Sequence, residues 1–188
     1  MSFQDALYDP CPENSNICVV CGNSGTLFCC DSCPRSFHEK CHIHPINRKR
    51  DPWYCLFCCI KGIQENLSPD KCHQESEVLI SPMNYVNKMK CKFLLLKIFS
   101  FPKSSFFIRE PYYSRDQMCE VLKKPMWLNK IKRNLIGREY LNVGQFVADI
   151  RLVIENHKIM YKNESIVNLA YQLEKEFENH FKTIFEIQ

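Results

Sequence analysis

The sequence predicts a small zinc-stabilised finger followed by an all-α four-helix bundle. Eight cysteine and histidine residues with zinc-ligand spacing lie between residues 18 and 58, and the cysteine density falls sharply after residue 59. From residue 75 onward, apolar residues recur at the three- and four-residue steps of helices. A chain of 188 residues has room for two small domains, and we expect them at residues 15–62 and 73–187.

The zinc-ligand set consists of four pairs of residues, and two other residues separate the members of each pair. In chain order the pairs are Cys18 and Cys21, Cys30 and Cys33, His38 and Cys41, and Cys55 and Cys58. A pair with this spacing can sit on a tight turn whose two side chains converge on one metal ion, and tetrahedral zinc needs two such pairs. Eight ligands therefore predict two zinc ions.

Thirteen cysteines in a chain of this length would also suit the disulfide scaffold of a secreted protein. Their number is odd and no apolar signal segment precedes the cluster, so we favour zinc and a reducing compartment. Cys29 competes with Cys30 for a ligand position, but only Cys30 has the required spacing. For the same reason, we choose His38 over His42 and His44 as the histidine ligand.

The ligand order of four cysteines, one histidine and three cysteines resembles that of the PHD finger. The run from Cys29 to His38 and the tryptophan Trp53, two residues before Cys55, match its signature. The resemblance implies that the first and third pairs hold one zinc ion and the second and fourth pairs hold the other. A RING finger has its histidine one ligand earlier, where this chain has Cys33, so that class is excluded.

The second module begins with a predicted helix over residues 75–99, where apolar residues recur mostly at three- and four-residue steps. Pro82 fits the first turn of this helix or a kink in it. Residues 101–124 are rich in aromatic side chains and punctuated by prolines, but they have no sustained period. We expect a long aromatic loop there.

Three further helices are predicted after this loop. A short one follows Pro125 and should stop near Gly137, and a longer one should span residues 143–161. Ser165 is the expected N-cap of the last helix, which has a continuous apolar stripe. Four helices with a long first connection indicate an all-α bundle.

This half of the chain resembles a bromodomain over about residues 75–187. The likeness rests on Glu110-Pro111, the run 124–128 and the run 146–157. A bromodomain directly behind a PHD finger is an arrangement of chromatin readers, and it implies an α+β finger packed on a left-handed four-helix bundle.

A narrower likeness is to the C-terminal part of the nuclear-body speckled-protein family, and it rests on the runs 35–39, 73–79 and 125–130. Full-length members of that family add N-terminal domains that include a DNA-binding SAND domain. DNA is therefore expected as a partner only through domains outside this sequence, and nuclear-body proteins are candidate partners.

Bromodomains that read acetyl-lysine have an asparagine at the end of the third helix, and its amide donates to the acetyl carbonyl. The motif has Tyr161 at that position, and Asn163 could replace the asparagine only if the helix end shifted register. Met118 and Cys119 fall near the usual loop tyrosine. Tyrosine is bulkier than asparagine and offers one hydroxyl, so we expect weak or no acetyl-lysine binding.

Histone-binding PHD fingers pair the tail with a strand between the second and third ligands, by strand addition. In this chain the segment is Thr26-Leu27-Phe28-Cys29. Asp31 falls where relatives hold the second-position arginine of the tail, although an aspartate that caps the zinc knuckle is an equally good interpretation.

The tail's fourth-position lysine is expected to be unmodified. Trimethyl-lysine needs an aromatic cage, and none of the positions that commonly build one is aromatic here. Readers of the unmodified lysine have acidic or polar oxygens, and Asn16 and Thr26 fall at those positions, with Glu13 nearby.

Residues 1–70 contain six basic and eight acidic side chains, whereas residues 71–188 contain nineteen and thirteen, for net charges of −2 and +6. An acidic finger suits a basic ligand such as a histone tail. No run of eighteen apolar residues occurs, so no membrane span is expected. We predict a nuclear chromatin reader that acts in transcriptional regulation, with nuclear bodies as a candidate location.

A catalytic role is not expected, because zinc would saturate the recognisable cysteine and histidine ligands and no nucleophile–base arrangement stands out. Two alternatives stay open. In one PHD–bromodomain family the finger recruits a SUMO-conjugating enzyme and the bundle is docked rigidly to it, which makes an intramolecular ligase. The other alternative is a protein-docking scaffold of nuclear bodies.

Overall fold

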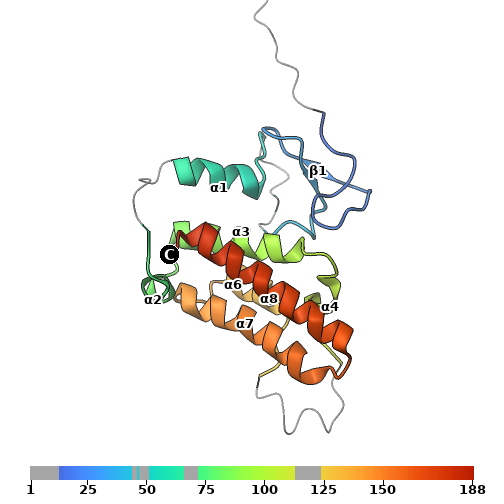
Figure 1. Ribbon diagram of the computed structural model, residues 1–188. Helices are drawn as coiled ribbons and strands as arrows, with labels where there is room; N and C mark the ends of the chain where they lie inside the picture. The colour runs from blue at the N-terminus through green and yellow to red at the C-terminus, as the bar shows by residue number, and fades with distance from the viewer. Residues whose placement is uncertain (1–12, 44–45, 47–50, 66–71, 113–123) are drawn as a thin grey trace, which may run out of the picture.

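The computed structural model describes residues 13–43, 46, 51–65, 72–112 and 124–188. In the finger, strand β1 (Phe28–Cys29) pairs antiparallel with strand β2 (Ser36–Phe37). Helix α1 (Leu56–Glu65) closes the finger and runs alongside the bundle (Figure 1). Because strands of two residues make few hydrogen bonds, the sheet needs other constraints to hold its shape.

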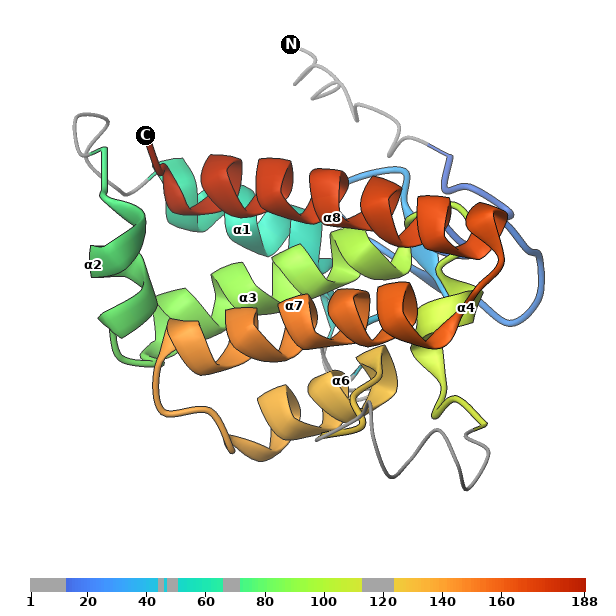
Figure 2. The same cartoon turned by 60° about the horizontal axis from the view of Figure 1, so that its bottom comes forward.

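The bundle consists of four long helices and two short ones in its described part. They are α2 (Glu75–Ile80), α3 (Tyr85–Phe99), α4 (Ser105–Ile108), α6 (Leu128–Gly137), α7 (Val143–Met160) and α8 (Glu164–Phe185). Helices α3 and α7 both pack against α8, and α6 packs against α3 and α7 (Figure 2). Within the described residues, no helix has the length and apolar character needed to span a bilayer.

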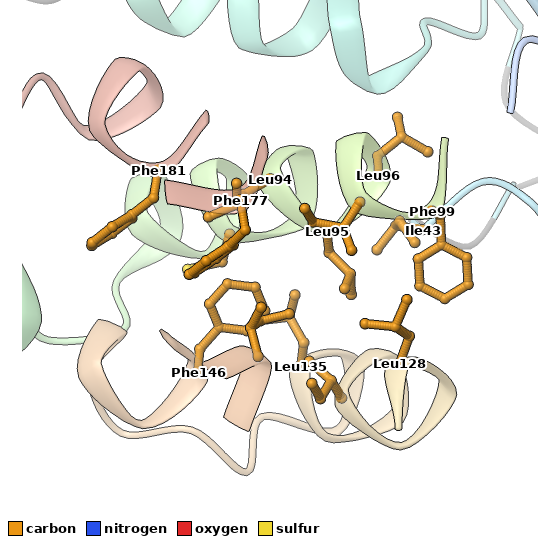
Figure 3. Packing of buried hydrophobic residues seen from close by; sticks show 14 of the residues in the cluster. Ile43, Leu94, Leu95, Leu96, Phe99, Leu128, Leu135, Phe146, Phe177 and Phe181 are labelled. Atoms are coloured by element: carbon orange, nitrogen blue, oxygen red, sulfur yellow. The ribbon is translucent and has the colours of Figure 1, made fainter. Parts of the chain in front are cut away.

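The interior of the bundle is filled by large apolar side chains that its helices direct toward one another (Figure 3). The Phe177 and Phe181 rings of α8 stack with centroids 5.9 Å apart. Phe146 of α7 and Leu94 and Leu95 of α3 are fully buried beside them. Each such side chain contributes roughly 1.5–3 kcal/mol by leaving water, so this interior is the main source of the bundle's stability.

The finger shares this hydrophobic core with the bundle. Leu56 and Ile60 of α1 are 1% and 2% exposed and belong to the same buried cluster as the α3 side chains. Phe57 packs edge-on against Phe93 of α3, with ring centroids 5.1 Å apart. The predicted fold class, a finger packed on an all-α bundle, is therefore confirmed.

Charged side chains reinforce the contact between the two modules. The Lys97 ammonium of α3 lies 5.0 Å from the centroid of the Phe57 ring on α1, and within the finger the Arg35 guanidinium lies 4.5 Å from the same ring. Lys132 of α6 donates to the backbone carbonyls of Lys40 and His42, at 2.8 and 3.1 Å. These carbonyls flank the zinc ligand Cys41, so α6 holds the finger directly beside its first metal cluster.

The prediction of one helix over residues 75–99 is wrong, because α2 and α3 are separated at residues 81–84. Pro82 has no N–H to donate within a helix. The Ser81 backbone ends α2, and the Asn84 side chain accepts a hydrogen bond from the Asn87 N–H at 2.8 Å and so begins α3. The apolar spacing continues across the break, which is why the pattern concealed it.

The predicted aromatic loop at 101–124 contains the short helix α4, whose Phe107 is fully buried. Residues 113–123 lie outside the described residues. The predicted end of α6 near Gly137 and the predicted span of α7 are confirmed to within one residue. Ser165 is not the N-cap of α8, because the Asn163 side chain caps it by accepting from the Ser165 N–H at 2.9 Å.

Helix α1 was not predicted, and it extends past the expected end of the finger at residue 62. Its buried residues Leu56 and Ile60 are interleaved with zinc-ligand cysteines. The short apolar pattern is therefore hard to recognise in the sequence, because it lies among cysteines already assigned to the zinc site.

We predict that Ile60→Ala lowers the free energy of unfolding of the zinc-loaded chain by about 2–5 kcal/mol, because it opens a cavity in the shared core. Ile80→Ala makes the same chemical change at a side chain that is 79% exposed, and it should cost at most about 0.5 kcal/mol. Denaturant unfolding followed by circular dichroism measures both. Equal effects of the two substitutions would contradict a core that includes α1.

Candidate functional site

Two clusters of potential metal ligands lie in the finger. The ligand atoms of each cluster are all within 4.8 Å of one another. The first cluster comprises Cys18, Cys21, His38 and Cys41, and the second comprises Cys30, Cys33, Cys55 and Cys58. This is the interleaved pairing that the PHD resemblance implies, with the first and third pairs in one cluster and the second and fourth in the other.

The imidazole of His38 is oriented for metal binding. Its Nε2 lies 3.1 Å from the carbonyl oxygen of Ser24, which can only accept, so Nε2 carries the proton. Nδ1 then has its lone pair directed at the cluster, 3.3 Å from Cys21 Sγ. Gly25, with φ of 141°, makes room for this ring, because a Cβ there would lie 2.9 Å from Nε2. Sequence reasoning missed Ser24 and Gly25 as supports for His38.

The electrostatics of both clusters call for a cation. Burial opposes ionisation of Cys18, but hydrogen bonds from backbone N–H groups outweigh it and lower the pKa of Cys18 to about 7. Burial and the nearby Cys18 and Cys21 thiolates raise the pKa of Cys41 to about 12. Burial likewise raises the pKa of Cys55 in the second cluster, and the neighbouring Cys30 thiolate adds to this. The thiols cannot all ionise without a compensating positive charge.

Zinc fits these residues. Tetrahedral sets of four thiolates, or of three thiolates and one imidazole, are its usual structural ligands. The Cys55 N–H donates to Cys30 Sγ at 3.2 Å, which stabilises the thiolate form of that ligand. Cys29 lies outside both clusters and is exposed, and its sulfur accepts a hydrogen bond from the Ser36 hydroxyl at 3.5 Å. The prediction of two zinc ions is supported by both clusters.

Trp53 and His42 belong to the small core of the finger. The His42 ring packs edge-on against Trp53 and Phe37, with centroids 5.2 and 4.9 Å apart. His42 Nε2 accepts from the Leu56 N–H at 3.2 Å, and the side chain is buried. These contacts explain why His42 is not a zinc ligand, and Trp53 is partly buried against the core. His44 lies outside the described residues.

The residues expected to meet a histone tail lie along β1. Strand β2 has β1 on one side and a bridge between Cys18 and Ser36 on the other, so β1 is the outer strand of the sheet in the described part of the chain. The predicted strand segment is longer than the observed one. Thr26 and Leu27 precede β1, because the chain bends at residues 25–26. Asn16 and Thr26 are exposed.

Asp31 directly follows the zinc ligand Cys30 and connects two segments of the finger. Its carboxylate accepts from the Trp53 N–H at 2.6 Å, and its own N–H donates to the Trp53 carbonyl at 3.0 Å. This pair of bonds corresponds to the knuckle-capping interpretation. The side chain is nevertheless exposed, so it is also accessible to a ligand.

Tyr161 is the C-cap of α7, and its backbone N–H donates to the His157 carbonyl at 3.3 Å. The Tyr161 and His157 rings lie 5.6 Å apart. His157 is fully buried, and its Nε2 lies 2.9 Å from the Phe106 carbonyl at α4. The role of His157 in joining α7 to α4 has no local signal in the sequence.

The other two residues predicted for the bundle pocket are Asn163 and Met118. The carboxamide oxygen of Asn163 caps α8 through the Ser165 N–H, and the residue is exposed. Helix α7 ends at Met160, before Tyr161. Met118 lies outside the described residues.

Comparison with known proteins identifies both modules. The PHD-finger family matches residues 18–58 and the bromodomain family matches residues 91–173. The chain is 33% identical to E3 ubiquitin-protein ligase TRIM33 of Danio rerio over 174 residues, which cover 87% of this chain and 14% of that protein. It is 33% identical to TRIM33 of Homo sapiens over 153 residues, covering 76% and 13%.

Tripartite motif-containing protein 66 of Homo sapiens is 29% identical over 185 residues, which cover 94% of this chain and 14% of that protein. The chain thus spans a small part of the length of the relatives it matches. The narrower resemblance to the nuclear-body speckled-protein family stays a prediction.

We predict that Cys30→Ser lowers the zinc content of the purified chain from two ions to one, because it removes a ligand of the second cluster. Cys29→Ser, the same change at the neighbouring residue, should leave two zinc ions bound. Elemental analysis of both variants measures this. Loss of zinc from the Cys29 variant, or its retention by the Cys30 variant, would contradict the assignment.

Proposed function

Because the chain is a PHD finger followed by a bromodomain, we propose that it is a nuclear chromatin reader that grips the N-terminal tail of histone three. The finger, at residues 15–62, adds the tail as a further strand beside β1, with the fourth-position lysine unmodified. The bundle, at residues 73–187, holds the finger rigidly and binds acetyl-lysine weakly or not at all. The chain acts in transcriptional regulation by binding and catalyses no reaction.

The outer position of β1 is the observation that carries this proposal. A strand at the edge of a sheet offers backbone groups to an extended peptide, and this pairing requires no particular side chain. Cys30, a ligand of the second cluster, follows β1 directly, and its N–H donates to the Arg35 carbonyl at 3.0 Å. The edge is therefore attached to the metal frame and needs little ordering when a peptide binds.

The residues at the positions expected to meet the fourth-position lysine favour its unmodified form. Asn16 and Thr26 are exposed and polar, and such oxygen-bearing side chains can accept from an ammonium group. A quaternary trimethylammonium has no N–H to donate and needs the faces of aromatic rings. Asp31 lies beside β1 with an exposed carboxylate that suits the second-position arginine of the tail.

The end of α7 supports a bundle without strong acetyl-lysine binding. Tyr161 is at the position of the acetyl-lysine asparagine, and its half-buried ring lies near His157. Asn163 is engaged in capping α8. Tyr161 has no carboxamide, and its ring is bulkier than the asparagine side chain that acetyl-lysine readers have at this position.

One observation favours the ligase-type alternative. The core shared by α1 and α3 docks the finger rigidly on the bundle, which is the arrangement expected of an intramolecular SUMO ligase module. TRIM33 is named as a ubiquitin ligase, but this chain covers only a small part of that protein. Self-modification in a conjugation assay with purified components would favour this alternative.

We predict that calorimetric titration finds the strongest binding with the unmodified histone-three tail, and weaker binding when the fourth-position lysine is trimethylated. Asp31→Asn keeps an acceptor for the Trp53 N–H but removes the charge, and it should weaken binding about tenfold. Glu65→Gln neutralises an exposed carboxylate on α1 as a control and should have no effect. Failure of the unmodified peptide to bind would overturn the reader proposal.

We also predict that Tyr161→Asn creates acetyl-lysine binding in the bundle, because it supplies the missing amide donor and clears the pocket. Affinity for an acetylated histone peptide should rise at least about tenfold over the unsubstituted chain. Tyr161→Phe, which removes only the hydroxyl, is the matched control and should not bind. Acetyl-peptide binding by the unsubstituted chain as tight as that of the Asn variant would contradict the assignment of Tyr161.

A further inference from the structure

A groove of about 420 Å³ lies at the end of the bundle where α3 begins and α6 turns into α7. Figure 2 shows this end on the side of α2, away from the α7–α8 connection that holds Tyr161. Tyr85, Lys88, Arg138 and Leu141 line it, and we call it the basic groove. None of the tail-binding or acetyl-lysine residues contributes to it.

The backbone around the basic groove is held in place by hydrogen bonds between distant segments. The Met83 N–H donates to the Leu141 carbonyl at 2.9 Å, and the Val143 N–H donates to the Ser81 carbonyl at 3.1 Å. These two bonds tie the start of α3 to the connection before α7. The groove is thus a preformed surface, and a ligand would not have to order it.

Two large apolar side chains at this groove are exposed to water. Tyr85 is 73% exposed and Leu141 is 74% exposed. Single exposed apolar residues are common, but two that line the same groove mark an interaction surface. This apolar character requires a partner with apolar side chains of its own.

The charges at the basic groove have one sign. Burial and the nearby Arg138 guanidinium lower the pKa of Lys88, so the two cations are close enough to repel each other. Among the described residues, no carboxylate lines the groove. The carboxylate nearest in sequence, Glu139, lines a different cavity together with Lys124 and Asp149.

Arg138 is held in an uncommon backbone conformation. Its φ is +66°, in the left-handed region, where it caps α6 by donating its N–H to the Asn134 carbonyl. Glycine takes this position at many helix ends because a side chain there is strained. An arginine kept at a strained position beside a groove is a feature that binding would explain.

We propose that the basic groove docks a short acidic segment of a partner protein, whose carboxylates meet Lys88 and Arg138 and whose apolar side chains cover Tyr85 and Leu141. The net charge of +6 on residues 71–188 would attract such a segment. A nucleic acid is the weaker fit, because a phosphate track engages a longer row of cations and would leave Leu141 in water. The groove would recruit a partner while the finger holds the tail.

The test uses the full zinc-loaded chain and a fluorescein-labelled peptide in which glutamate alternates with leucine and phenylalanine. Fluorescence anisotropy should detect binding that weakens with salt, and amide shifts in NMR spectra should cluster at Tyr85, Lys88, Arg138 and Leu141. Replacing both cations, with Lys88→Glu and Arg138→Glu, should weaken binding at least about tenfold. Leu141→Ser should weaken it about tenfold as well.

Matched controls are available elsewhere on the surface. Lys175→Glu reverses an exposed charge on α8, and Tyr112→Ser removes a ring that is 95% exposed; neither should change peptide binding. Arg138→Gly should raise the melting temperature, by relieving the strained φ, and still weaken binding. If Arg138 served only the fold, the more stable Arg138→Gly variant would keep its peptide binding.

Three results would overturn the proposal. The first is equal peptide affinity of the unsubstituted chain and the double charge-reversal variant. The second is equal affinity for a peptide in which glutamine replaces every glutamate. The third is binding of a DNA duplex at this groove, shown by shifts of the same amides, when the acidic peptide gives none.

Discussion

The repulsion between closely packed cysteine thiolates is the constraint on which the finger depends. Each cluster gathers four ligand atoms within 4.8 Å, and burial makes the charged forms still more costly. A divalent cation reverses this balance and turns mutual repulsion into a cross-link between segments. The two strands have only two residues each, so the metal, more than the sheet, sets the position of the β1 edge.

The finger and the bundle are joined through a common core. Helix α1 begins directly after the ligand Cys55 and buries Leu56 and Ile60 in the cluster that α3 also enters. Lys132 of α6 reaches back to carbonyls on both sides of Cys41. The β1 edge proposed to bind the tail, the tyrosine end of α7 and the basic groove are therefore surfaces of one body, in a fixed arrangement.

Features encoded by local spacing could be predicted from the sequence, whereas those made by tertiary contacts could not. The ligand pairs and α7 follow from residues a few positions apart. The break at Pro82 was concealed because apolar residues continue at helical steps on both sides. The sequence alone could not decide whether Asp31 caps the zinc knuckle or binds a ligand, since its bond to the Trp53 N–H joins segments far apart in sequence. No sequence motif marks Arg138 of the basic groove, because its backbone conformation appears only in the fold.

Calorimetric unfolding of the chain with zinc and after chelation tests most directly the claim that metal-ordered finger and bundle form one cooperative body. We expect a single transition for the zinc-loaded chain. After chelation we expect a bundle transition at a clearly lower temperature, because α1 no longer covers the α3 side of the core. A bundle transition that keeps its midpoint when zinc is removed would show that the finger and the bundle are not one cooperative body.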